Sequence, residues 1–165
     1  MGIGSALARP LARGLEKRWV LLGTLLPDLI DKPLYYGLSL VTGRVGADIG
    51  LISCTRTFGH TGLLLALLVA ASLRSRSRVL LALALGMATH GPLDIALDVL
   101  SGPGPSSAIV AFLFPLQGVG FAAMPYRSPI EHLGGLLDPA HLVSEVLGLA
   151  LLFWGRGPWG DPRAR

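Results

Sequence analysis

Five long apolar segments dominate the sequence, and short polar or glycine- and proline-containing stretches separate them. They cover residues 19–40, 49–73, 79–100, 108–124 and 138–155. Apolar runs of this length that are bounded by charges are typical of helices in a membrane or in a buried core. Because no long linker or internal repeat divides them, we expect a single helical domain over residues 19–155.

The apolar segments are not equivalent as membrane spans. Segment 108–124 contains Pro115 and two glycines, which predict a broken or re-entrant helix rather than a straight crossing. The expected fold is therefore an all-α, small polytopic transmembrane bundle with about four to five membrane segments.

The composition favours the membrane class over the alternative, a soluble helical protein with a large apolar core. Hydrophobic residues make up 52% of the 165 residues, charged residues make up 15%, and the mean hydropathy is +0.61. A soluble domain usually carries about 25% charged residues. The clusters of charged residues also fall almost entirely between the apolar segments.

Basic residues suggest both an orientation and a surface segment. We expect residues 1–18 to form a basic amphipathic helix on the membrane surface, because leucines and basic residues each recur every four positions, half a turn apart. The RSRSR sequence at 74–78 is predicted to face the cytoplasm by the positive-inside rule. The net charge of +4 fits this use better than nucleic-acid binding, since no aromatic residues alternate with the basic ones.

Polar residues interrupt the apolar segments at three places, with the sequences PDLIDKP (27–33), RTFGHTG (56–62) and THGPLDIALD (89–98). In the third, His90, Asp94 and Asp98 recur every four residues and so share one face of a helix. Ionisable groups in apolar surroundings are costly unless they are paired, bound to metal or in a wet cavity. These three sequences are therefore the candidate functional regions, and the single Cys54 is predicted to be a core residue.

The spacing predicts that the histidines of two of these regions meet. In an antiparallel hairpin of 49–73 and 79–100, His60 and His90 lie 16 and 14 residues from Arg76, at the tip. At 1.5 Å per residue these are depths of about 24 and 21 Å. A helix that starts near Arg18 brings Asp28 and Asp31 to the same half of the bilayer.

Imidazole and carboxylate groups in one place suit zinc or another first-row divalent metal, which can retain an activated water. A carboxylate outside the metal's ligand set is a candidate general base. Arg56 is expected on the same helix as His60, where it either holds an anionic substrate group such as phosphate or pairs with Asp94. The sequence lacks a nucleophile elbow and a P-loop, so these other hydrolytic sites are not expected.

The motifs PDLIDKP, RTFGHT, GMATHGPLD and FLFPL, in this order, resemble those of the LexA-regulated, membrane-bound, metal-dependent hydrolase family of bacterial and archaeal inner-membrane proteins. The resemblance runs from about Leu21 to Gln117. The chain departs from the family pattern in two respects: it has no histidine before His60, and Thr55 stands where some members have one. Matched position by position, the resemblance implicates Asp28, Asp31, Arg56, His60, His90 and Asp94, with Pro115 in the last motif.

Together these observations predict a multi-pass protein of the cell inner membrane that uses a metal-activated water to hydrolyse a phosphoester or another lipid-associated bond. The expected partners are membrane lipids and a hydrophobic or anionic small-molecule substrate, without nucleic acid. The predicted ligands of a divalent metal, in particular zinc, are Asp28, Asp31, His60, His90 and Asp94. The predicted catalytic residues are Asp31, Arg56 and Asp94. The alternative function is that of a non-catalytic membrane protein or an ion- or proton-coupled transporter.

Two further expectations concern the C-terminal part of the chain. Its polar residues, Glu131, His132, His141 and Glu145, are predicted to be solvated or interfacial because glycines and a proline accompany them. Residues 156–165 are predicted to be a disordered tail.

Overall fold

The structure, a computed structural model, describes residues 2–12, 14–100 and 106–123, together with residues 142–143, 146–147 and 150. All regular elements among these residues are helical, which confirms the predicted all-α class for this part of the chain. The α-helices are α1 (Gly2–Ala8), α2 (Lys17–Thr42), α3 (Gly62–Ser75), α4 (Arg78–Leu100) and α5 (Ser107–Phe112). Two 3₁₀ helices, η1 (Gly46–Ile49) and η2 (Phe58–His60), lie between α2 and α3.

The predictions for the C-terminal part fall largely on residues that the structure does not describe. The tail 156–165 and the four polar residues Glu131, His132, His141 and Glu145 lie outside the described residues. Most of the predicted apolar segment 138–155 does as well.

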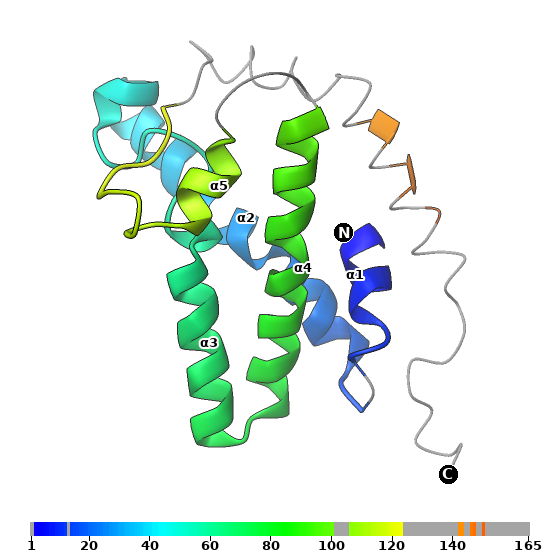
Figure 1. Cartoon of the computed structure of the whole chain (residues 1–165). Helices are drawn as coiled ribbons and strands as arrows, with labels where there is room; N and C mark the ends of the chain where they lie inside the picture. Colours follow the sequence, from blue (N-terminus) through cyan, green and yellow to red (C-terminus); the bar gives the residue numbers. More distant parts are fainter. Residues whose placement is uncertain are drawn as a thin grey trace.

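Helices α3 and α4 form the predicted antiparallel hairpin and lie side by side (Figure 1). The turn between them is short because Arg76 adopts a left-handed conformation, with a φ of 52°, and its backbone N–H donates to the carbonyl of Ser72. The basic RSRSR sequence therefore lies at the tip of the hairpin.

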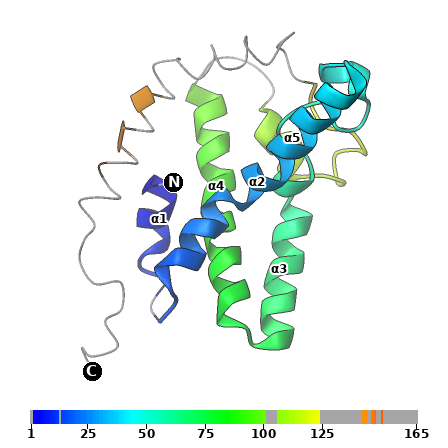
Figure 2. The same cartoon turned by 180° about the vertical axis from the view of Figure 1, so that it is seen from behind.

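Helix α2 crosses α4 at very close range, as the view from behind also shows (Figure 2). Two glycines make this approach possible. A Cβ atom on Gly23 would lie 2.3 Å from the carbonyl oxygen of Leu83, and one on Gly86 would lie 2.2 Å from that of Val20. Small residues at a helix crossing allow backbones to pack directly against each other, which is a common device in membrane proteins.

The N-terminal segment differs from the predicted surface helix over residues 1–18. Helix α1 ends at Ala8, a turn follows, and α2 begins at Lys17. Proline at position 10 explains the early end, because it lacks an N–H and disfavours helical geometry at the preceding residue. Ala8 and Ala12 are buried in a cluster with Val20 and Ala82, so this segment packs against the helices rather than lying apart from them.

The predicted apolar segments 49–73 and 108–124 are also only partly helical. Residues 50–57 are irregular, and α3 starts at Gly62 after Thr61, whose side-chain oxygen accepts a capping hydrogen bond from the Leu64 N–H. Helix α5 ends at Phe112, and a turn that contains Pro115 follows, which agrees with the predicted break.

Among the described residues, one helix has the length and composition to cross a membrane. This is α4, with 23 residues and a mean hydropathy of 1.5. Helix α3 is apolar but has 14 residues, about 21 Å, whereas a bilayer core is about 30 Å thick. Helix α2 is long enough but carries Asp28, Asp31 and Lys32 near its centre. The predicted bundle of four to five spans is therefore not confirmed.

The close crossing of α2 and α4 predicts a strong effect of one added methyl group. Gly86→Ala should destabilise the protein by about 1–3 kcal/mol, because the new Cβ cannot fit against the α2 backbone. The measurement is the thermal unfolding midpoint of the detergent-purified chain. Gly37→Ala is the matched control, since Gly37 lies in α2 with nothing within 4 Å of the added Cβ. Equal midpoints for the two variants would contradict the close crossing.

Candidate metal centre

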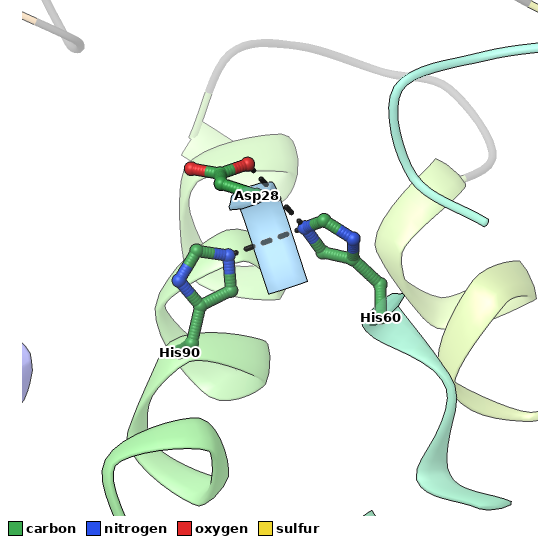
Figure 3. A group of neighbouring side chains, drawn as sticks. All are labelled: Asp28, His60 and His90. Atoms are coloured by element: carbon green, nitrogen blue, oxygen red, sulfur yellow. Dashed lines mark hydrogen bonds and ion pairs between the residues drawn. The ribbon is translucent and has the colours of Figure 1, made fainter. Parts of the chain in front are cut away.

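Two imidazoles from different elements face each other. His60 ends η2 and His90 lies in α4, and their Nε2 atoms are 3.2 Å apart (Figure 3). Asp28 of α2 joins them, with Oδ1 at 3.7 Å from Nε2 of His60. One ligand atom from each of these three residues lies within 4.8 Å of the others. The hairpin thus brings together the two histidines that the spacing predicts to meet.

The buried carboxylate of Asp31 determines which nitrogen of His60 is available. Its side chain is 0% exposed and accepts a hydrogen bond from Nδ1 of His60 at 2.7 Å. An ionised carboxylate can only accept, so Nδ1 carries the hydrogen. In a neutral ring, Nε2 of His60 then has a free lone pair that points toward His90 and Asp28.

Three more hydrogen bonds saturate the Asp31 carboxylate. The backbone N–H and the hydroxyl of Thr57 donate to it at 2.7 and 2.8 Å, and the backbone N–H of Gly59 donates at 2.9 Å. The structure therefore places Asp31 behind His60, where it orients the imidazole, and not beside Asp28 in the group of converging ligand atoms.

A backbone carbonyl orients His90 in the same way. Nδ1 of His90 lies 2.8 Å from the carbonyl oxygen of Thr24 in α2. A carbonyl can only accept, so this Nδ1 also carries the hydrogen, and Nε2 of a neutral His90 again has a free lone pair. Histidines that bind metals are usually held through their second nitrogen by a carboxylate or a carbonyl, and both kinds of partner are present here.

Asp94, one helical turn after His90, adds a second carboxylate beside these nitrogens. Its Oδ2 lies 3.5 Å from Nε2 of His60 and 3.5 Å from Nε2 of His90. Asp94 thus flanks the three-residue group formed by Asp28 and the two histidines.

The spacing of these acceptor atoms fits a divalent metal. Zinc bonds of about 2.0–2.1 Å in a tetrahedral site set neighbouring ligand atoms about 3.3 Å apart. The observed separations are 3.2 Å between the two nitrogens and 3.7 Å from His60 to Asp28, and all three ligand atoms lie within 4.8 Å of one another. Lone pairs at such distances repel each other unless a cation lies among them. A metal ion or a shared proton between these atoms would relieve this repulsion.

Contrary to the prediction from the sequence, Arg56 does not lie on a helix together with His60. It is in the irregular stretch before η2, so the prediction that it shares a helix with His60 is wrong. The reason is tertiary, because the hydrogen bonds of Asp31 hold the backbone of Thr57 and Gly59 in a loop.

The guanidinium of Arg56 is engaged by two carboxylates. Its Nε lies 3.0 Å from Oδ2 of Asp94, and its Nη1 lies 2.6 Å from Oδ1 of Asp98. Burial alone would lower the pKa of Arg56, but Asp94 and Asp98 outweigh it and raise the pKa above its ordinary value. Of the two predicted roles, this geometry matches the pairing with Asp94.

Asp98 is a residue of this network that the predicted site does not include. Its Oδ2 accepts hydrogen bonds from the Ser106 hydroxyl at 2.9 Å and from the Ala108 N–H at 3.1 Å, at the start of α5. Arg56 also donates to the Ser107 hydroxyl at 2.8 Å. The four-residue spacing from Asp94 to Asp98 is the sequence signal that could have identified it. No sequence signal could have identified the carbonyl of Thr24 as the partner of His90, because every residue has a backbone carbonyl.

Cys54 lies near this network but takes no part in the group of ligand atoms. It is 6% exposed, its thiol donates to the carbonyl oxygen of Arg56 at 3.0 Å, and burial raises its pKa. A thiol in such surroundings stays protonated and behaves as a small core side chain.

Comparison with known proteins does not identify the chain, since no protein-family model, no curated protein and no solved structure matches it. The likeness of its motifs to the metal-dependent hydrolase family remains a prediction from the sequence.

The pairing of Arg56 predicts a large loss of stability when the guanidinium is removed. Arg56→Ala should destabilise the metal-free protein by about 2–4 kcal/mol, because it leaves two partly buried carboxylates without their cation. Adding Asp98→Asn should recover part of this loss. Thermal unfolding in detergent measures both effects, with Arg44→Ala, a change at an exposed arginine, as the control. Equal stability of the Arg56 and Arg44 variants would refute the structural pairing.

Proposed function

We propose that the chain is a membrane-bound, metal-dependent hydrolase that acts on a phosphoester or another lipid-associated bond. One observation carries the proposal, namely the convergence of the Nε2 atoms of His60 and His90 with the Asp28 carboxylate within 4.8 Å. Both Nδ1 atoms are already committed to Asp31 and Thr24. The remaining lone pairs therefore have a common target, and a divalent cation satisfies all of them.

Three protein ligands are typical of a catalytic zinc site, which keeps one position for water. In the proposed site these ligands are Asp28, His60 and His90. A zinc ion, or another first-row divalent metal, supplies a water that is acidic enough to react as a nucleophile near neutral pH. The side chain of Asp28 is 28% exposed, so the ligand set is accessible from its side.

Asp94 is the proposed general base. Its Oδ2 is 3.5 Å from both ligand nitrogens, which suits a carboxylate that takes a proton from a water beside them. Arg56 holds the same oxygen through Nε at 3.0 Å. This contact fixes the direction of the carboxylate, so Arg56 is a positioning residue in this proposal and does not bind substrate.

The exposed apolar surface supports location in a membrane. Only 22% of the apolar window of α4 is buried inside the protein, whereas a core helix of a soluble protein is mostly buried. In α3, Leu63, Leu67 and Leu73 are 49%, 57% and 70% exposed. We propose that lipid covers these faces and that the chain resides in the inner membrane, with further crossings besides α4.

The metal proposal predicts that both histidines are needed for binding. Detergent-purified protein should contain one divalent metal per chain, and His60→Ala and His90→Ala should each lower this content at least about tenfold. Elemental analysis after dialysis measures it, and Asp48→Asn, a change at an exposed carboxylate in η1, is the control. Asp94→Asn should keep the metal while it abolishes hydrolysis of a phosphodiester such as bis(p-nitrophenyl) phosphate.

Two results would exclude the hydrolase. One is full metal content in both histidine variants. The other is a metal-free chain that conducts protons when reconstituted in liposomes, because the two facing imidazoles would then share a proton in a transport path.

The membrane proposal also predicts an orientation. A reporter fused after Arg76 should be cytoplasmic, because three arginines lie at this turn. A reporter fused after Leu100 should lie on the opposite side, since α4 is the only element between the two fusion points. Paired phosphatase and fluorescent-protein fusions measure both sides, and a cytoplasmic signal at both points would contradict a crossing by α4.

A further inference from the structure

A small pocket lies directly beside the two histidines. Its wall includes both imidazoles together with Pro27 of α2, Leu65 of α3 and Phe112 of α5, so four elements besides α4 meet around it. The space in this pocket that a water-sized group can reach measures about 10 Å³. This is about the size of one water or one methylene group. The pocket is therefore narrow.

Apart from the two histidines, the wall offers no free polar group. Met87 of α4 adds a further apolar side chain. The hydroxyl of Thr61 also lies in the wall, but it already donates to the carbonyl of Phe58 at 2.8 Å and accepts from the N–H of Leu64 at 3.1 Å. A charged or strongly polar group would lose its hydration here without finding partners, whereas an apolar group is stabilised.

The polar and apolar sides of the site are separate. Asp28 and Asp94 lie against the histidine nitrogens but do not form part of the pocket wall. A molecule that reacts at the proposed metal thus meets carboxylates on one side and a narrow apolar pocket on the other.

We propose that this pocket receives an unbranched alkyl group attached to the scissile bond, so that the substrate is an alkyl phosphoester. The inference rests on the proposed hydrolase function and specifies its substrate class. The two histidines in the wall bring the alkyl group next to the reacting centre. The small volume, bounded in part by Pro27, Met87 and Phe112, favours a straight chain over a branched one.

Binding of alkyl phosphonates to the cobalt-loaded protein tests this inference without relying on turnover. The full chain in detergent is loaded with Co²⁺, and its visible spectrum is followed during titration with methyl-, n-propyl- and isopropylphosphonate. Affinity should rise about fourfold in total from methyl to n-propyl, because the cavity has room for about one added methylene. Isopropylphosphonate, which has the same atoms as the n-propyl compound in a wider shape, should bind no better than methylphosphonate.

Two substitutions in the wall change the pocket in opposite ways. Gly91→Ala adds a Cβ that would lie 3.6 and 3.8 Å from ring carbons of Phe112, an ordinary contact that preserves the fold while it fills the pocket. It should remove the preference for n-propyl over methyl. Phe112→Ala widens the pocket and should raise the affinity for the isopropyl compound. Phe121→Ala is the control, because Phe121 stacks on Phe114 and does not line the pocket.

The failures of the two proposals are distinguishable. A chain that binds no Co²⁺ overturns the metal centre and the substrate inference together. A chain that binds Co²⁺ but shows equal affinities for the three phosphonates overturns the alkyl pocket alone. So does an n-propyl preference that Gly91→Ala leaves unchanged.

Discussion

The buried carboxylate of Asp31 is the interaction on which the rest of this structure depends. It is fully buried, and four hydrogen bonds from residues 57–60 satisfy it. A buried charge without such partners would cost several kcal/mol, so the carboxylate and the loop must form together. Because the loop then passes directly into Thr61, the cap of α3, the same interaction fixes where α3 begins and where the His60 imidazole points.

A single stripe of α2 supports the whole candidate centre. Thr24, Asp28 and Asp31 follow each other at intervals of four and three residues, which places them on one face of the helix. The backbone carbonyl of Thr24 accepts a hydrogen bond from His90, and the carboxylate of Asp31 accepts one from His60. The carboxylate of Asp28 contributes an oxygen to the site itself. The glycine-mediated crossing of α2 and α4 brings this stripe within reach of His90. A rigid helix therefore orients ligands from two other elements.

The sequence predicts helix existence and hairpin pairing well, because both follow from apolar periodicity and the short turn at Arg76. The meeting of His60 with His90 follows from this pairing and from helical rise alone. The sequence predicts less well the features that depend on tertiary hydrogen bonds. From the sequence, the stretch around Arg56 is expected to be helical, because it lies in an apolar segment. In the structure it is a loop, because backbone N–H groups in this stretch donate hydrogen bonds to the Asp31 carboxylate. Segment 49–73 is not confirmed as a single membrane-spanning helix for the same reason, since residues 50–57 lie in it without being helical.

The ion pairs of Arg56 connect the carboxylate side of the proposed site with its apolar pocket. Arg56 connects Asp94, beside the ligand nitrogens, with Asp98, which accepts from the N–H of Ala108 at the start of α5. Phe112 at the other end of this short helix forms part of the apolar wall. The direction of the proposed base and the position of the pocket wall thus depend on the same guanidinium. Since α5 has only six residues, its position depends on contacts with neighbouring elements, among them the hydrogen bonds that Asp98 accepts from residues at its start. The proposed chemistry and the proposed substrate fit therefore both depend on two partly buried carboxylates and the guanidinium that they share.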